Sequence, residues 1–122
     1  MNPFKFLKSL FTPAPRLRPW ECAPRVLAAK AVLIDVREPD EWRSGVAEGA
    51  VLLPLSDLGG SREHWRPFLE QNAGRELFCY CAAGGRSAIA ARTLVSEGFR
   101  AANAGSLGDW RDSGWPVLPP RI

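Results

Sequence analysis

Three short apolar runs constrain the fold of this chain more than any other feature of its sequence. They cover residues 31–36, 50–54 and 77–80. Each run is almost continuously apolar, as is typical of strands that are buried on both faces of a parallel sheet. Helix-like segments separate the runs, and strands that alternate with helices indicate an α/β domain with a mainly parallel central sheet.

The segments around the three strands carry signals of helices and of one further strand. The clearest helix is expected from Ser87 to Glu97, because a glycine that ends a helix follows at Gly98. A weak fourth strand is expected over residues 99–103. Further helices are expected over residues 20–30, directly after Pro39, on both sides of the Gly59–Gly60 pair and over residues 107–112.

Residues 1–19 differ in character from the rest of the chain. Five apolar side chains within residues 3–12 share one side of a helix that turns by about 100° per residue, and the lysines share the other. We expect this amphipathic arm to dock on protein or on a membrane surface, or else to be disordered. Three prolines between Thr12 and Pro19 predict a stiff linker. The domain itself is then expected over residues 20–122.

The charge of the chain excludes one class of partner. Of the 122 residues, 16 are basic and 13 are acidic, which gives a net charge of +3. Four of the basic residues and none of the acids lie in residues 1–20, so the domain is close to neutral. A near-neutral domain argues against nucleic acid as a partner.

Cysteine usage indicates the compartment. Cys22, Cys79 and Cys81 are too few and too irregularly spaced for a disulfide framework or a zinc site. Three thiols of this kind fit a reducing compartment, and we expect the cytoplasm. No apolar run is long enough to cross a bilayer. We expect neither a metal nor a cofactor.

One cysteine stands in a setting that suits a nucleophile. Cys81 ends an apolar strand, and the residues after it lead directly into the clearest helix. Glycines allow backbone N–H groups to converge on one point, and a helix N-terminus adds positive potential there. Such surroundings lower a thiol pKa. The predicted site loop consists of Cys81, Ala82, Ala83, Gly84, Gly85, Arg86 and Ser87.

A second group of polar residues is expected at the same edge of the sheet. Asp35 ends the first apolar strand and Arg37 follows it closely. Because the carboxyl ends of parallel strands meet at one edge, we place both residues in the predicted site. Asp35 serves either in catalysis and substrate binding or in tying neighbouring loops together, and the role of Arg37 is equally open.

Four stretches, in order, make the chain resemble the single-domain rhodanese-like sulfurtransferase family. The likeness covers roughly residues 20–118. The stretches are Leu33-Ile34-Asp35-Val36-Arg37-Glu38-Pro39-Asp40-Glu41-Trp42, Gly49-Ala50-Val51-Leu52-Leu53-Pro54-Leu55, Tyr80 to Ser87, and Gly105-Ser106-Leu107-Gly108-Asp109-Trp110-Arg111 with Gly114-Trp115-Pro116-Val117.

The resemblance implies an enzyme that moves a sulfane sulfur through a persulfide on Cys81. The donor would be a small compound such as thiosulfate, and the acceptor cyanide, a small thiol or a protein. Ala82 stands where many thiosulfate-using members carry a basic residue, which favours a less charged or protein-bound donor. Val46 stands where members often have histidine.

Two alternatives to a thiosulfate sulfurtransferase stay open. One is a sulfur-relay or interaction module with weak thiosulfate activity, and the other is a cysteine phosphatase. Four residues separate Cys81 from Arg86, whereas phosphatases with a similar loop carry one residue more. The shorter loop favours sulfur over phosphorus. Arg86 either attracts an anionic donor or pins the loop by pairing with an acid.

Overall fold

A computed structural model describes residues 13–121. The elements are α2 (Pro19–Leu27), β1 (Ala31–Asp35), the 3-10 helix η1 (Pro39–Ser44), β2 (Val46–Ala47), β3 (Val51–Leu52), α3 (Leu55–Leu58), α4 (Trp65–Gln71), β4 (Glu76–Cys81), α5 (Gly85–Ser96), β5 (Ala101–Ser106), α6 (Leu107–Asp112) and β6 (Val117–Leu118). The α/β expectation is confirmed. The amphipathic arm over residues 3–12 lies outside the described residues.

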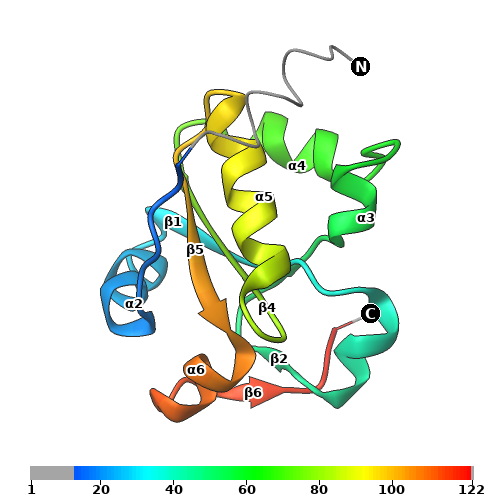
Figure 1. The fold of residues 1–122 in the computed structure, drawn as a ribbon. Helices are drawn as coiled ribbons and strands as arrows, with labels where there is room; N and C mark the ends of the chain where they lie inside the picture. The colour runs from blue at the N-terminus through cyan, green and yellow to red at the C-terminus, as the bar shows by residue number, and fades with distance from the viewer. Residues whose placement is uncertain (1–12, 122) are drawn as a thin grey trace.

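A four-stranded parallel sheet in the order β3-β1-β4-β5 forms the middle layer (Figure 1). Alternate strand residues face two separate apolar clusters. On one face, Ile34 and Cys79 pack with Leu94 of α5 and with side chains of α3 and α4. On the other face, Phe78 packs with Trp110 of α6 and with α2. The sheet is therefore covered on both faces, as its continuous apolar strands predict.

A second, two-stranded sheet was not expected from the sequence. In it, β2 pairs antiparallel with β6, with Val46 opposite Leu118 and Ala47 opposite Val117. Strands of two residues show no periodicity that a sequence can reveal. This small sheet lies beside the carboxyl ends of the central strands (Figure 1).

Three expected boundaries are corrected. The run over 50–54 forms a strand only at Val51–Leu52, because Pro54 has no N–H with which to continue a ladder. The fourth strand covers Ala101–Ser106 rather than 99–103, since the N–H of Phe99 still closes the end of α5 on Leu94. The main helix begins at Gly85 rather than at Ser87.

The segment expected as a linker follows the edge of the central sheet. The N–H of Leu17 donates to the carbonyl of Asn103 on β5, and the N–H of Asn103 donates to the carbonyl of Pro15, both at 2.9 Å. Arg16 forms a parallel bridge with Asn103. These bonds cover part of an edge that a strand otherwise leaves open. In the described part of the chain, no helix has the length and apolar character that crossing a membrane requires.

Candidate active site

The thiol of Cys81 lies inside the loop that joins β4 to α5. The backbone N–H of Gly84 donates to its Sγ at 3.0 Å, and the N–H of Ser87 donates at 3.4 Å. The Ser87 hydroxyl lies 3.3 Å from the same sulfur. Gly84 adopts a left-handed φ of +98°, which a glycine accepts without strain and which turns the loop into the helix. Cys81 itself is 1% exposed.

The electrostatics of this loop favour a thiolate. Burial raises the pKa of Cys81, but hydrogen bonds lower it by more, so that the pKa lies below its ordinary value. The donors are the Ser87 side chain and the backbone N–H groups of Ser87, Ala83 and Gly84. Buried N–H donors of this kind stabilise a negative charge more strongly than water-exposed ones do. The site can therefore hold an anionic sulfur.

The other two cysteines have the opposite character. Burial raises the pKa of Cys22 to about 12, and it also raises the pKa of Cys79, which lies two residues before Cys81 in β4, to about 12. Both thiols are fully buried. Among the three cysteines, only Cys81 thus has the surroundings of a nucleophile near neutral pH.

Behind the loop, a buried amide holds Ser87 in place. The Oδ1 of Asn103 accepts from the Ser87 hydroxyl at 2.7 Å and from the N–H of Gly105 at 3.0 Å. Its Nδ2 donates to the carbonyl of Gly84 at 3.1 Å. Asn103 is 6% exposed, so its side chain depends on these partners. Asn103 was missed by sequence reasoning, although a polar residue in the run Ala101 to Ala104 was a signal.

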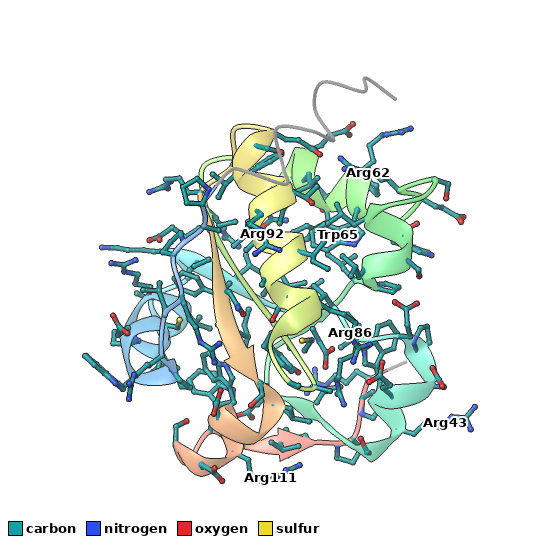
Figure 2. The ribbon with its side chains drawn as sticks, viewed as in Figure 1. Arg43, Arg62, Trp65, Arg86, Arg92 and Arg111 are labelled. Atoms are coloured by element: carbon teal, nitrogen blue, oxygen red, sulfur yellow. The ribbon has the colours of Figure 1, made fainter. Side chains whose placement is uncertain are left out.

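Arg86 forms an ion pair with a residue of η1. Its Nη1 and Nη2 donate to the two carboxylate oxygens of Glu41 at 2.5 and 2.9 Å. Of the two roles predicted for Arg86, this geometry is that of pairing with an acid. Figure 2 labels Arg86 at the loop end of α5. Glu41 was not among the predicted site residues, because nothing in its sequence position reveals a contact 45 residues along the chain.

Asp35 and Arg37 form a second, buried ion pair. The Nη2 of Arg37 donates to Asp35 at 2.8 Å and to the carbonyl of Gly45 at 2.7 Å. The hydroxyl of Tyr80 donates to Asp35 at 2.7 Å and accepts from the N–H of Ala47 at 2.9 Å. Neither charged side chain is a hydrogen-bond partner of the Cys81 thiol, so the arrangement is that of a structural support.

The remaining predicted site residues form the loop between Cys81 and Arg86. Ala82, Ala83 and Gly85 are exposed, and Gly84 is buried. The structure thus brings Cys81, the small loop residues, Arg86 and Ser87 together, with Asp35 and Arg37 in a neighbouring network.

A central parallel sheet, with a cysteine thiol that accepts hydrogen bonds from backbone N–H groups at the end of a strand, defines a class of α/β proteins with a reactive cysteine. The sequence model of the rhodanese-like domain family matches residues 23–112, and the chain belongs to that family. A crystal structure of a rhodanese-related protein from Thermoplasma volcanium superposes with a TM-score of 0.71 at 27% identity, over 87% of this chain and 99% of that one.

Curated relatives are similar at modest identity. Thiosulfate sulfurtransferase 16, a chloroplastic protein of Arabidopsis thaliana, is 33% identical over 92 residues, which cover 69% of this chain and 77% of that protein. Rhodanese-like/PpiC domain-containing protein 12 of the same plant, also chloroplastic, is 36% identical over 77 residues. That match covers 62% of this chain and only 24% of the relative.

Proposed function

We propose that the protein is a sulfurtransferase that carries sulfur as a persulfide on Cys81. This proposal rests on the surroundings of the Cys81 thiol. Its sulfur accepts hydrogen bonds from the N–H groups of Gly84 and Ser87, and its pKa lies below the ordinary value. A thiolate prepared in this way needs no separate general base. The similarity to a protein named thiosulfate sulfurtransferase supports the same chemistry.

The reaction proceeds in two balanced steps. The Cys81 thiolate attacks the outer sulfur of a donor such as thiosulfate, the S–S bond of the donor breaks, and its electron pair leaves with sulfite. An acceptor thiolate or cyanide then attacks the terminal sulfur of the persulfide, and the Cys81 thiolate is restored. The loop N–H groups stabilise the anionic terminal sulfur, while Ala82, Ala83 and Gly85 leave room for it.

A second candidate function is sulfur relay to a protein acceptor. The observation that favours it is the rim of the site, where the exposed loop residues Ala82, Ala83 and Gly85 carry no charge. A protein thiol can approach such a rim without losing a charged contact. We place both candidate functions in the cytoplasm, since the three free cysteines fit a reducing compartment.

Mass spectrometry of the intact protein tests the proposal. Incubation with sulfane-sulfur donors, thiosulfate among them, is expected to add one sulfur atom to the wild-type chain and none to Cys81→Ser. Cyanide added afterwards is expected to remove that sulfur as thiocyanate. If no donor adds sulfur, both candidate functions fail. Efficient hydrolysis of an aryl phosphate would instead support a cysteine phosphatase.

A further inference from the structure

The charge that a sulfur donor meets at this site depends on Arg86. Arg86 directly precedes Ser87, whose N–H and hydroxyl contact the sulfur of Cys81. Hydrogen bonds to Glu41 raise the pKa of Arg86, and the charge of Cys81 also raises it. An unpaired arginine in this place would attract an anionic donor. Whether Arg86 is paired or unpaired therefore determines how strongly the site attracts an anionic donor.

Glu41 removes most of that attraction. Both of its carboxylate oxygens accept from Arg86, at 2.5 and 2.9 Å. Hydrogen bonds from Arg86, together with one from the N–H of Glu38, lower the pKa of Glu41 to about 2 although burial opposes them. Glu41 is thus ionised at neutral pH, and the pair has no net charge.

The other ionised side chains of this cluster do not add a positive charge. The charge of Glu38 also raises the pKa of Arg86. Arg37, the other arginine of the predicted site, is fully matched by Asp35 at 2.8 Å. With the thiolate of Cys81 added, the ionised side chains of this cluster have a net negative charge, which opposes a dianion twice as strongly as a monoanion.

We propose that Glu41 is a specificity-determining residue that, by neutralising Arg86, disfavours doubly charged sulfur donors relative to donors with one charge or none. This inference rests on the proposed sulfur transfer at Cys81. According to this inference, the preferred donors carry at most one negative charge, and the preference depends on Glu41 in η1 rather than on the residues of the Cys81 loop.

Two small donors that differ in charge test the inference. Thiosulfate carries two negative charges, and methanethiosulfonate, in which a methyl group replaces one oxygen, carries one. Both give up their outer sulfur to a thiolate, and the leaving groups are sulfite and methanesulfinate. We expect Glu41→Gln to raise kcat/KM about tenfold for thiosulfate and about threefold for methanethiosulfonate, as for a unit charge removed from about 6 Å away in a water-like medium.

The ratio of the two kcat/KM values is the decisive quantity. Removal of Glu41 also favours ionisation of Cys81, but that effect is common to both donors and cancels in the ratio. A ratio of thiosulfate to methanethiosulfonate that rises about threefold supports the inference. An unchanged or smaller ratio overturns it, whatever happens to the absolute rates.

A second arginine–glutamate pair provides the matched control. Arg62 donates to both oxygens of Glu97 at 2.6 and 2.7 Å. Glu97 caps the opposite end of α5 from the loop, and Figure 2 labels Arg62 beside α3 and α4, well away from Arg86. Glu97→Gln removes the same charge and the same kind of pair, and we expect it to leave the donor ratio unchanged.

The wild-type chain alone gives an independent test if Glu41→Gln does not fold. Repulsion between like charges weakens as salt is added. We therefore expect kcat/KM to rise with ionic strength, with a slope for thiosulfate about twice that for methanethiosulfonate. A rate that falls with salt would show a free cation at the site and overturn the inference. Failure of both donors to form a persulfide would instead refute the proposed function.

Discussion

The reactivity of Cys81 depends on opposing effects within a few ångströms of its sulfur. Burial disfavours the thiolate, whereas the N–H groups of the loop and the Ser87 hydroxyl favour it and outweigh burial. The hydroxyl has a single proton, and besides the sulfur it has two acceptors within reach, the Oδ1 of Asn103 at 2.7 Å and the carbonyl of Gly105 at 3.4 Å. When Cys81 is protonated, the Ser87 hydroxyl can donate its proton to the Oδ1 of Asn103. When Cys81 is a thiolate, the hydroxyl donates that proton to the sulfur instead.

The first prediction concerns the pH at which Cys81 becomes reactive. Alkylation by iodoacetamide follows the thiolate, so its rate falls as pH drops through the pKa. We expect a midpoint below 9.0 in the wild type, the ordinary value for cysteine. Ser87→Ala removes one hydrogen bond to sulfur and is expected to shift the midpoint upward and slow alkylation at neutral pH severalfold.

A serine at the far end of the same helix serves as the control. Ser96 donates to the carbonyl of Thr93 at 2.6 Å, so Ser96→Ala also removes a hydroxyl from α5. We expect its midpoint to equal that of the wild type. If Ser87→Ala alkylated with the same pH profile, the hydroxyl would have no part in stabilising the thiolate.

At the residue scale, sequence reasoning found the side chains whose role follows from local order and missed those that act across the fold. The loop from Cys81 to Ser87 is continuous in sequence, and a strand, two glycines and a helix are enough to predict a convergent set of N–H groups. Glu41 and Asn103 reach the loop only through tertiary contacts. No periodicity or spacing in one sequence encodes such a contact.

At the scale of elements, the core strands and the last helix were predicted well, whereas the two-residue strands β2 and β6 and the start of the longest helix were not. The core strands β1 and β4 and the helix α6 lie where the sequence places them. The start of α5 was wrong by two residues, because Gly84 caps the helix and its carbonyl already accepts the N–H of Ala88 at 3.2 Å. Ser87, the expected start, lies inside the helix, and its hydroxyl is 3.3 Å from the thiol sulfur of Cys81.

The second prediction concerns the edge segment at Pro15–Leu17. Leu17→Pro removes the N–H that donates to Asn103 on β5, and it also removes the side chain that packs on the core. Leu17→Ala removes only the side chain. We expect Leu17→Pro to lower the free energy of unfolding by about 1 kcal/mol more than Leu17→Ala, which is the net contribution of one hydrogen bond. Urea unfolding measures the difference.

Hydrogen exchange provides an independent check on this edge. The amide of Leu17 is expected to exchange more slowly than amides in exposed loops, because its N–H is bonded at 2.9 Å. Equal stability of the two variants, with a rapidly exchanging Leu17 amide, would mean that the segment does not pair with β5. A proline-rich stretch gave no sign of this pairing, since prolines are typical of linkers and of strand edges alike.

At the scale of the whole molecule, one buried network joins the two sheets. Asp35, the last residue of β1, lies opposite Tyr80 of the neighbouring strand β4. Arg37 donates to the carbonyl of Gly45, and the hydroxyl of Tyr80 accepts from the N–H of Ala47 in β2. Asp35 and Arg37 are 0% and 4% exposed. Each charge therefore depends on the other, because water cannot replace a lost partner.

The third prediction follows from this dependence. Arg37→Leu leaves the carboxylate of Asp35 buried with only Tyr80 and backbone donors, and we expect the free energy of unfolding to fall by about 3–5 kcal/mol. Arg25→Leu is the control, because Arg25 pairs with Glu76 at 2.8 Å with a side chain that is half exposed. An exposed pair contributes about 0–1 kcal/mol. Urea unfolding of the two variants measures both values.

Arg37→Leu also separates the two roles that the sequence left open for Arg37. A structural role predicts lower stability together with persulfide formation at Cys81 that persists in the folded fraction at low temperature. A role in donor binding predicts the reverse, an unchanged urea midpoint and a loss of persulfide. The ion pair, the Gly45 contact and the burial all favour the first outcome, because a guanidinium with its donors engaged in this way has few left for a ligand.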